Sequence, residues 1–258
     1  MHRVSSRTRV TVSYDVYGSG TPLVLLHGSF SDHVTNWEHV KPFLEPLFEV
    51  YAIARRGRGE TEATEGHRIE DESADAVKVI ESIGRPVFLL GHSYGAVTAL
   101  AVAARIPDRI LKLVLYEPAN PRILKGERLA RLERLAQAHD WEQFALTFFR
   151  DTLCVPTDEL EKLRRTALWP PIVGDARASW NDLLALTGHD FRAESFTTLE
   201  VPVMLQVGTR SPREIYITDA LAAVLPDVRV KELPGQAHEG MTTAPRMYAD
   251  AVSRFLLS

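Results

Sequence analysis

Apolar runs and amphipathic segments alternate through most of the chain. Four of the runs in the first half are apolar nearly throughout, which is typical of strands buried on both faces of a parallel sheet. A fifth run alternates apolar and polar positions and predicts a half-exposed strand at residues 10–17. The four buried strands are expected at residues 22–26, 48–54, 86–90 and 111–116.

Segments with helical spacing separate these runs. Residues 69–83 place apolar side chains on one face, and Gly84 ends the expected helix. Residues 36–47 also have helical spacing, although Pro42 and Pro46 limit its regularity. A further helix is expected at residues 96–105. This alternation predicts an α/β fold with a mostly parallel sheet and helices on both faces.

The pattern changes between residues 119 and 199, where runs typical of strands are absent. Four helical segments are expected there, at residues 122–138, 141–152, 158–168 and 176–186. We interpret residues 119–199 as a helical cap inserted into a core of residues 1–118 and 200–258. In the second part of the core, strands are expected at residues 202–207 and 228–233, and helices at residues 214–225 and 245–257.

Composition excludes several classes of function. The 258 residues carry a net charge of −4, so there is no basic surface for nucleic acid. Cys154 is the only cysteine, which excludes an intrachain disulfide and a cysteine-based metal site. Residues 1–7 lack the apolar centre of a signal peptide, and no run is long enough to span a membrane. We therefore expect a cytoplasmic monomer or homodimer with a small-molecule substrate and no membrane partner.

Gly91, Ser93 and Gly95 form a G-x-S-x-G sequence between an expected strand and an expected helix. The glycines permit a tight turn that presents the serine hydroxyl at the carboxyl end of the strand. Free N–H groups at the beginning of the helix face whatever binds there. The pattern predicts a nucleophilic serine, although a glycine-rich connection without chemistry can have the same sequence.

A nucleophilic serine needs a histidine as its base. Among the nine histidines, His238 lies between the last expected strand and the last helix, at the same sheet edge as Ser93. His92 is the neighbour of Ser93 in sequence, but its side chain should point away from it. Backbone N–H groups of Ser29 and Tyr94 would form the oxyanion hole.

Four motifs in order resemble the α/β-hydrolase superfamily, and together they cover nearly the whole chain outside the cap. The resemblance implies an eight-stranded, mostly parallel sheet with a helical cap between strands six and seven. It also implies a triad of serine, histidine and an acid. The motifs are His27-Gly28, Arg56-Gly57-Arg58-Gly59, Gly91-His92-Ser93-Tyr94-Gly95 and Gly235-Gln236-Ala237-His238.

The position of the acid departs from the usual pattern of the superfamily. Its members usually carry the acid just after the seventh strand, but no carboxylate lies between Gly208 and Glu214. Certain haloalkane dehalogenases and zearalenone-type lactonases carry it after the sixth strand, where this chain has Glu117. The resemblance therefore assigns the acid to Glu117, with Glu214 as the alternative. A salt bridge from Glu117 to an arginine would be a purely structural role.

Two further departures lie in the loop around Arg56. Ala54 and Thr61 stand where relatives often have aspartate and serine. These changes affect the hydrogen bonding of the loop more than the chemistry.

The residues and the resemblance together predict a serine hydrolase that cleaves a carboxylic ester or lactone through an acyl-enzyme, without cofactor or metal. Phe30, Trp141 and Trp169 are candidates for substrate contact, although such aromatic residues also pack caps against cores. The same triad acts elsewhere in the superfamily as a carbon–carbon hydrolase, a cofactor-free peroxidase or a lyase. A small-molecule receptor of this fold is the alternative without catalysis.

Overall fold

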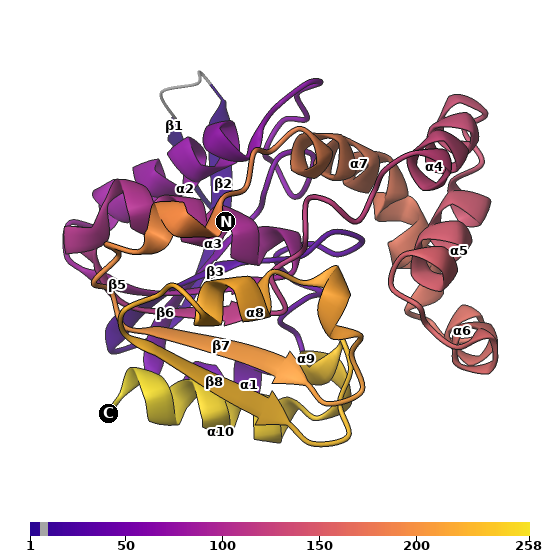
Figure 1. Cartoon of the computed structure of the whole chain (residues 1–258). Helices are drawn as coiled ribbons and strands as arrows, with labels where there is room; N and C mark the ends of the chain where they lie inside the picture. Colours follow the sequence, from indigo (N-terminus) through magenta and orange to yellow (C-terminus); the bar gives the residue numbers. More distant parts are fainter. Residues whose placement is uncertain (6–9) are drawn as a thin grey trace.

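The structure, a computed structural model, describes residues 1–5 and 10–258 (Figure 1). Ser6 and Arg7 of the amino-terminal stretch lie outside the described residues. Eight strands form one sheet in the order β1-β2-β4-β3-β5-β6-β7-β8, in which β2 runs antiparallel to its two neighbours and the other pairs are parallel. The strands are β1 (His2–Ser5), β2 (Thr11–Gly18), β3 (Thr21–Leu26), β4 (Phe48–Ile53), β5 (Val87–His92), β6 (Ile110–Tyr116), β7 (Val203–Gly208) and β8 (Val228–Leu233).

The predicted α/β architecture is confirmed, and strand β1 is an addition to the strands read from the sequence. Strand β1 pairs with β2 from His2 opposite Tyr14 to Ser5 opposite Thr11. Most of its residues are exposed, so the segment has no apolar face to mark it in the sequence. Its strand conformation depends on pairing with β2.

Helices cover both faces of the sheet (Figure 1). One apolar cluster joins the sheet to α2 (Ile69–Ile83), α3 (Tyr94–Arg105) and α8 (Thr218–Ala222). The cluster on the opposite face contains side chains from α1 (Lys41–Leu44) and α10 (Pro245–Leu256). The short α9 (Gly240–Thr243) precedes α10, and 3₁₀ turns cover Pro107–Arg109, Ala193–Phe196 and Arg213–Ile215.

Two expected helices of the core are much shorter than their sequence patterns suggested. Only Lys41–Leu44 is helical within residues 36–47. Pro46, two residues after Leu44, has no N–H to continue the helix. Within residues 214–225, the backbone of Ile215 and Ile217 bonds to residues 118–120 instead of to a helix. The helix therefore begins only at Thr218.

Four helices lie between β6 and β7, as the resemblance implies: α4 (Glu127–Gln137), α5 (Trp141–Asp151), α6 (Thr157–Arg164) and α7 (Trp169–Thr187). They extend to one side of the sheet (Figure 1) and share an apolar cluster in which Phe30 is the buried residue contributed by the core. Helix α7 begins seven residues earlier than expected, because Pro170 and Pro171 occupy its first turn, where proline is tolerated. The boundaries of the cap at residues 119–199 stay a prediction.

Among the described residues, no helix is both long and apolar enough to cross a lipid bilayer.

Candidate active site

Ser93 lies in the turn between β5 and α3 with φ 55° and ψ −118°, a conformation that is rare for a residue other than glycine. Its backbone N–H donates to the carbonyl of Tyr116 at 2.9 Å, which ties the turn to the neighbouring strand. A Cβ atom on Gly95 would lie 2.3 Å from the carbonyl oxygens of Leu26 and His27. The turn therefore needs glycine beside the serine, as the G-x-S-x-G pattern indicates.

The strand order brings Ser93 and Glu117 together. Strands β5 and β6 are neighbours, with His92 opposite Tyr116, so the next residue of each strand leaves the sheet at the same place. Strand β7 follows, and the N–H of Gly208 at its end donates to Oε1 of Glu117 at 2.8 Å. The carboxylate after the sixth strand thus reaches the end of the seventh.

Glu117 and His238 are hydrogen-bonded. Oε2 of Glu117 lies 2.7 Å from Nδ1 of His238, and the Glu117 side chain is fully buried. The hydroxyl of Tyr216 lies 3.0 Å from the same Nδ1, and its ring stacks on the imidazole at an interplanar angle of 15°. These contacts fix the ring orientation of His238 and place its proton on Nδ1, which leaves Nε2 as the acceptor.

The two charges of this pair stabilise each other. Burial by itself would raise the pKa of Glu117, but the hydrogen bond and positive charge of His238, together with the N–H of Gly208, outweigh it and lower that pKa. Burial by itself would lower the pKa of His238, but Glu117 outweighs it and raises that pKa. Both directions show that the Glu117 carboxylate stabilises the protonated form of His238.

Ser93 and His238 line one cavity beneath the cap. Among the described residues no hydrogen bond joins the Ser93 hydroxyl to His238, and such contacts often tighten only when substrate is bound. Apolar side chains of the lining come from the loop after β3, from the cap and from the segment after β7. They include Phe30, Phe148, Phe149, Leu183, Leu186 and Ile215.

Ser29 and Tyr94 also line this cavity. Within residues 1–5 and 10–258, neither of their backbone N–H groups has a hydrogen-bond acceptor, whereas the N–H of Phe30 donates to the hydroxyl of Ser179 at 2.6 Å. The Ser29 hydroxyl donates to Asp182 at 2.8 Å, whereas the backbone N–H of Ser29 stays free. Two unpaired N–H groups beside a serine hydroxyl are what an oxyanion hole requires.

Of the three aromatic residues predicted to contact substrate, only Phe30 lines the cavity. Trp169 packs edge-on against Phe149 at a centroid distance of 6.3 Å, and Trp141 packs against Phe144 at 5.7 Å. The structure does not bring these two tryptophans to the cavity, because they fill the apolar cluster of the cap behind its lining.

The alternative acid, Glu214, is exposed on the 3₁₀ turn before Tyr216. Its backbone carbonyl accepts a hydrogen bond from the Asn120 side chain, and the carboxylate of Asp219 pairs with Arg213. Among the described residues, neither carboxylate forms a hydrogen bond or ion pair with His238. Tyr216 itself had no sequence signal, since it lies in a segment predicted as helix.

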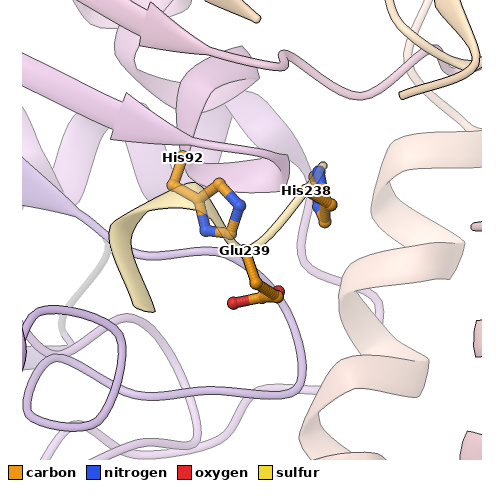
Figure 2. A group of neighbouring side chains, drawn as sticks. All are labelled: His92, His238 and Glu239. Carbon is orange, nitrogen blue, oxygen red and sulfur yellow. The ribbon is translucent and has the colours of Figure 1, made fainter. Parts of the chain in front are cut away.

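Among the described residues, two groups of side chains have ligand atoms close enough together for a metal ion. Figure 2 shows His92 beside His238 and Glu239, whose possible ligand atoms lie within 4.8 Å of one another. His92 lies 3.0 Å through Nδ1 from the side-chain oxygen of Asn36, and His238 is held by Glu117. An ion on His238 Nε2 would occupy the atom that serine catalysis uses, so we assign no metal to this group.

The second group consists of His67, Glu72 and Asp182. Its carboxylates are already paired with Arg55 at 3.0 and 2.7 Å, and Asp182 also pairs with Arg58 at 2.8 Å. A cation there would face two guanidinium groups. That no metal is needed stays a prediction.

Comparison with known proteins gives a consistent family. The sequence profile of the Alpha/beta hydrolase family matches residues 23–251. An uncharacterised hydrolase of Bacillus subtilis is 30% identical over 130 residues, 49% of this chain and 48% of the relative, so the match spans about half the relative's length. The 2-(acetamidomethylene)succinate hydrolase of Mesorhizobium japonicum is 25% identical over 99% of this chain and 96% of its own.

A solved α/β hydrolase from Sphaerobacter thermophilus superimposes with a TM-score of 0.85 at 26% identity, over 98% of this chain and 99% of that one. The profile match covers most of the chain, and the structural match covers both the sheet and the cap helices. The chain therefore belongs to the alpha/beta hydrolase family.

Proposed function

We propose that the protein is a serine hydrolase that cleaves a carboxylic ester or lactone of a small, apolar molecule through an acyl-enzyme. The observation that carries this proposal is the 2.7 Å contact between Glu117 and His238 on the wall of the cavity that Ser93 lines. An imidazole held by a buried carboxylate, beside a serine on a strained turn, is the arrangement that acyl transfer needs.

In the first half of the reaction, the Ser93 oxygen forms a bond to the carbonyl carbon while Nε2 of His238 takes the hydroxyl proton. Glu117 stabilises the resulting imidazolium. The N–H groups of Ser29 and Tyr94 bind the oxyanion, and loss of one such donor costs roughly 3 kcal/mol of transition-state stabilisation. The carbon–oxygen bond to the alcohol then breaks, and the alcohol leaves with the proton from His238.

In the second half, His238 takes a proton from water and the hydroxide attacks the acyl carbon. The bond to Ser93 breaks, its oxygen takes the proton back, and the carboxylic acid leaves.

The lining of the cavity favours a neutral acyl group. The described lining residues include two tyrosines, His238 and Glu239 as ionisable side chains. They include no lysine or arginine. A substrate carboxylate would lose its hydration without gaining a partner, which is costly. An apolar ester or lactone therefore fits better than a dicarboxylate of the kind that the name of the succinate hydrolase indicates.

The test is hydrolysis of p-nitrophenyl esters from acetate to octanoate and of neutral lactones. The rate is measured from the acid that is released. Ser93→Ala should lower turnover by roughly 10⁴-fold or more. The exposed Ser195 is a matched control, since Ser195→Ala should leave turnover unchanged. A fluorophosphonate should add one label to the wild type, at Ser93. Undiminished turnover in Ser93→Ala would refute the assignment, and binding of ligands without turnover would favour the receptor alternative.

A further inference from the structure

Helix α7 of the cap holds the loop of residues 27–30, here called the oxyanion loop. Two side chains about one turn apart on α7 make the contact. The Ser179 hydroxyl accepts the N–H of Phe30 at 2.6 Å, and Asp182 accepts the Ser29 hydroxyl at 2.8 Å. Both α7 side chains are fully buried. The cap is thus bonded to the backbone segment that carries one of the two free N–H donors.

Phe30 has φ 58°, an unfavourable conformation for a bulky side chain. Such a conformation persists only where surrounding contacts impose it. Among the described residues, the bond from its N–H to Ser179 is the one backbone hydrogen bond that Phe30 receives from the cap. Without that acceptor the Phe30 backbone would lose this constraint and could relax, and the peptide of Ser29 would turn with it.

Arg55 connects the same helix to both halves of the oxyanion hole. Its guanidinium bonds to Asp182 at 2.7 Å and to the carbonyl oxygens of His27 and Gly28 at 2.9 and 3.0 Å. It also lies over the ring of Tyr94, 4.4 Å from the ring centre. One side chain thus contacts the oxyanion loop and the residue that supplies the second N–H.

Arg58 completes the cluster from the same loop as Arg55. It bonds to Asp182 at 2.8 Å and to Asp175, one turn before Ser179, at 2.8 Å. Burial by itself would raise the pKa of Asp182, but the two guanidinium groups outweigh it and lower that pKa. Asp182 is therefore a charged carboxylate shared by two arginines and the oxyanion loop.

We propose that Ser179 and Asp182 of the cap helix α7 are positioning residues that set the oxyanion hole, so that α7 is a fixed wall of the active site and not a part of a moving lid. The proposal rests on the proposed function for its catalytic consequence.

The experiment compares Ser179→Ala with the wild type on p-nitrophenyl butyrate and on an alkyl boronic acid, whose adduct with Ser93 places an oxygen in the oxyanion hole. We expect kcat to fall about tenfold or more while KM changes less than about twofold, since small displacements of a catalytic donor act on the transition state. Boronate binding should weaken by the same factor. Ser179→Thr keeps the hydroxyl and should restore both values.

The matched control is Thr187→Ala on the same helix. The Thr187 hydroxyl bonds to the carbonyl of Leu183 at 2.7 Å and has no contact with the oxyanion loop. Thr187→Ala should leave kcat and boronate binding unchanged. Ser29→Ala is the second variant, in case Ser179→Ala folds poorly: it retains the backbone N–H, loses the bond to Asp182, and should also lower kcat. Wild-type kcat and boronate binding in folded Ser179→Ala or Ser29→Ala, with only thermal stability reduced, would overturn the proposal.

Amide hydrogen exchange separates this proposal from the proposed function. If the wild type neither turns over esters nor reacts with a fluorophosphonate, the hydrolase assignment fails. The positioning of the loop is still tested, because the peptide that covers residues 27–31 should exchange faster in Ser179→Ala than in the wild type and Thr187→Ala. Equal exchange in all three proteins would show that α7 does not hold the loop.

Discussion

The carboxylate of Glu117 lies 2.7 Å from Nδ1 of His238, although 121 positions separate the two residues in the chain. The contact forms because Glu117 follows β6, one strand away from β7, while His238 follows β8 on the far side of β7. Gly208 at the end of β7 bonds to the other carboxylate oxygen. The Glu117 carboxylate thus reaches His238 across the end of β7.

We predict that Glu117→Gln lowers kcat by roughly 10³-fold or more, because the imidazolium loses its partner and the tautomer of His238 is no longer fixed. The pH profile should move as well. Activity of the wild type falls as the pH falls through the pKa of His238, which Glu117 raises above its ordinary value. Without the carboxylate charge, that acid limb should move to lower pH.

The measurement is kcat/KM between about pH 5 and pH 9, the range in which a histidine titrates. Glu214→Gln is the control, since Glu214 is exposed and should behave as the wild type does. A larger loss in Glu214→Gln than in Glu117→Gln would transfer the role of the acid to Glu214.

Tyr216 should support His238 less strongly than Glu117 does. Tyr216→Phe keeps the ring that stacks on the imidazole and removes the hydroxyl 3.0 Å from Nδ1. Loss of one hydrogen bond predicts a decrease in kcat of about 2- to 10-fold. Tyr248→Phe is the matched control, because Tyr248 is buried against Tyr116 and its hydroxyl has no hydrogen-bond partner among the described residues. Equal kinetics of Tyr216→Phe and the wild type would contradict a role for the hydroxyl.

Gly95→Ala should destabilise the protein by about 1–3 kcal/mol or more, since the added Cβ would overlap backbone oxygens of Leu26 and His27 at 2.3 Å. Gly174→Ala should instead increase the free energy of unfolding. Gly174 is exposed on α7 with open space around it, and alanine in a helix is favoured by about 0.5–1 kcal/mol. Urea unfolding of the two variants measures both effects. A stable, active Gly95→Ala variant would disprove the tight packing of the turn.

Phe149 should limit the length of the acyl group. Its ring lines the cavity and meets Phe30 edge-on at a centroid distance of 5.3 Å. Phe149→Leu should increase kcat/KM for octanoate relative to butyrate, because space opens along the apolar wall. Phe191→Leu is the control, since Phe191 stacks on Phe196 and is absent from the lining. An unchanged ratio in Phe149→Leu would place the acyl group elsewhere.

Local signals predicted some elements closely. The expected helix at residues 69–83 agrees with α2 (Ile69–Ile83) at both ends, because its apolar stripe ends at Gly84, which adopts φ 78°. The strand at residues 228–233 is likewise confirmed as β8. Helix α7 begins at Trp169, earlier than the predicted residue 176, and Pro170 and Pro171 lie in its first turn, where proline is tolerated.

The surroundings of the proposed site were harder to predict. Tyr216 reaches His238 because its segment bonds to the backbone after β6, which no local pattern indicates. Asp182 lies on a helix whose spacing shows only that one face is buried, and its partners Arg55 and Arg58 come from a loop more than 120 positions away. A buried ion pair leaves no periodicity in the sequence.

The sequence by itself determined the α/β class, the strained turn at Ser93 and the histidine loop, because strand burial and glycine requirements are local properties that each segment carries with it. Only the tertiary structure decided that Glu117 and not Glu214 meets His238, that Phe30 and not the two tryptophans lines the cavity, and that α7 bonds to the oxyanion loop. These are distances between segments far apart in the chain, and they are set by strand order and by the packing of the cap on the sheet.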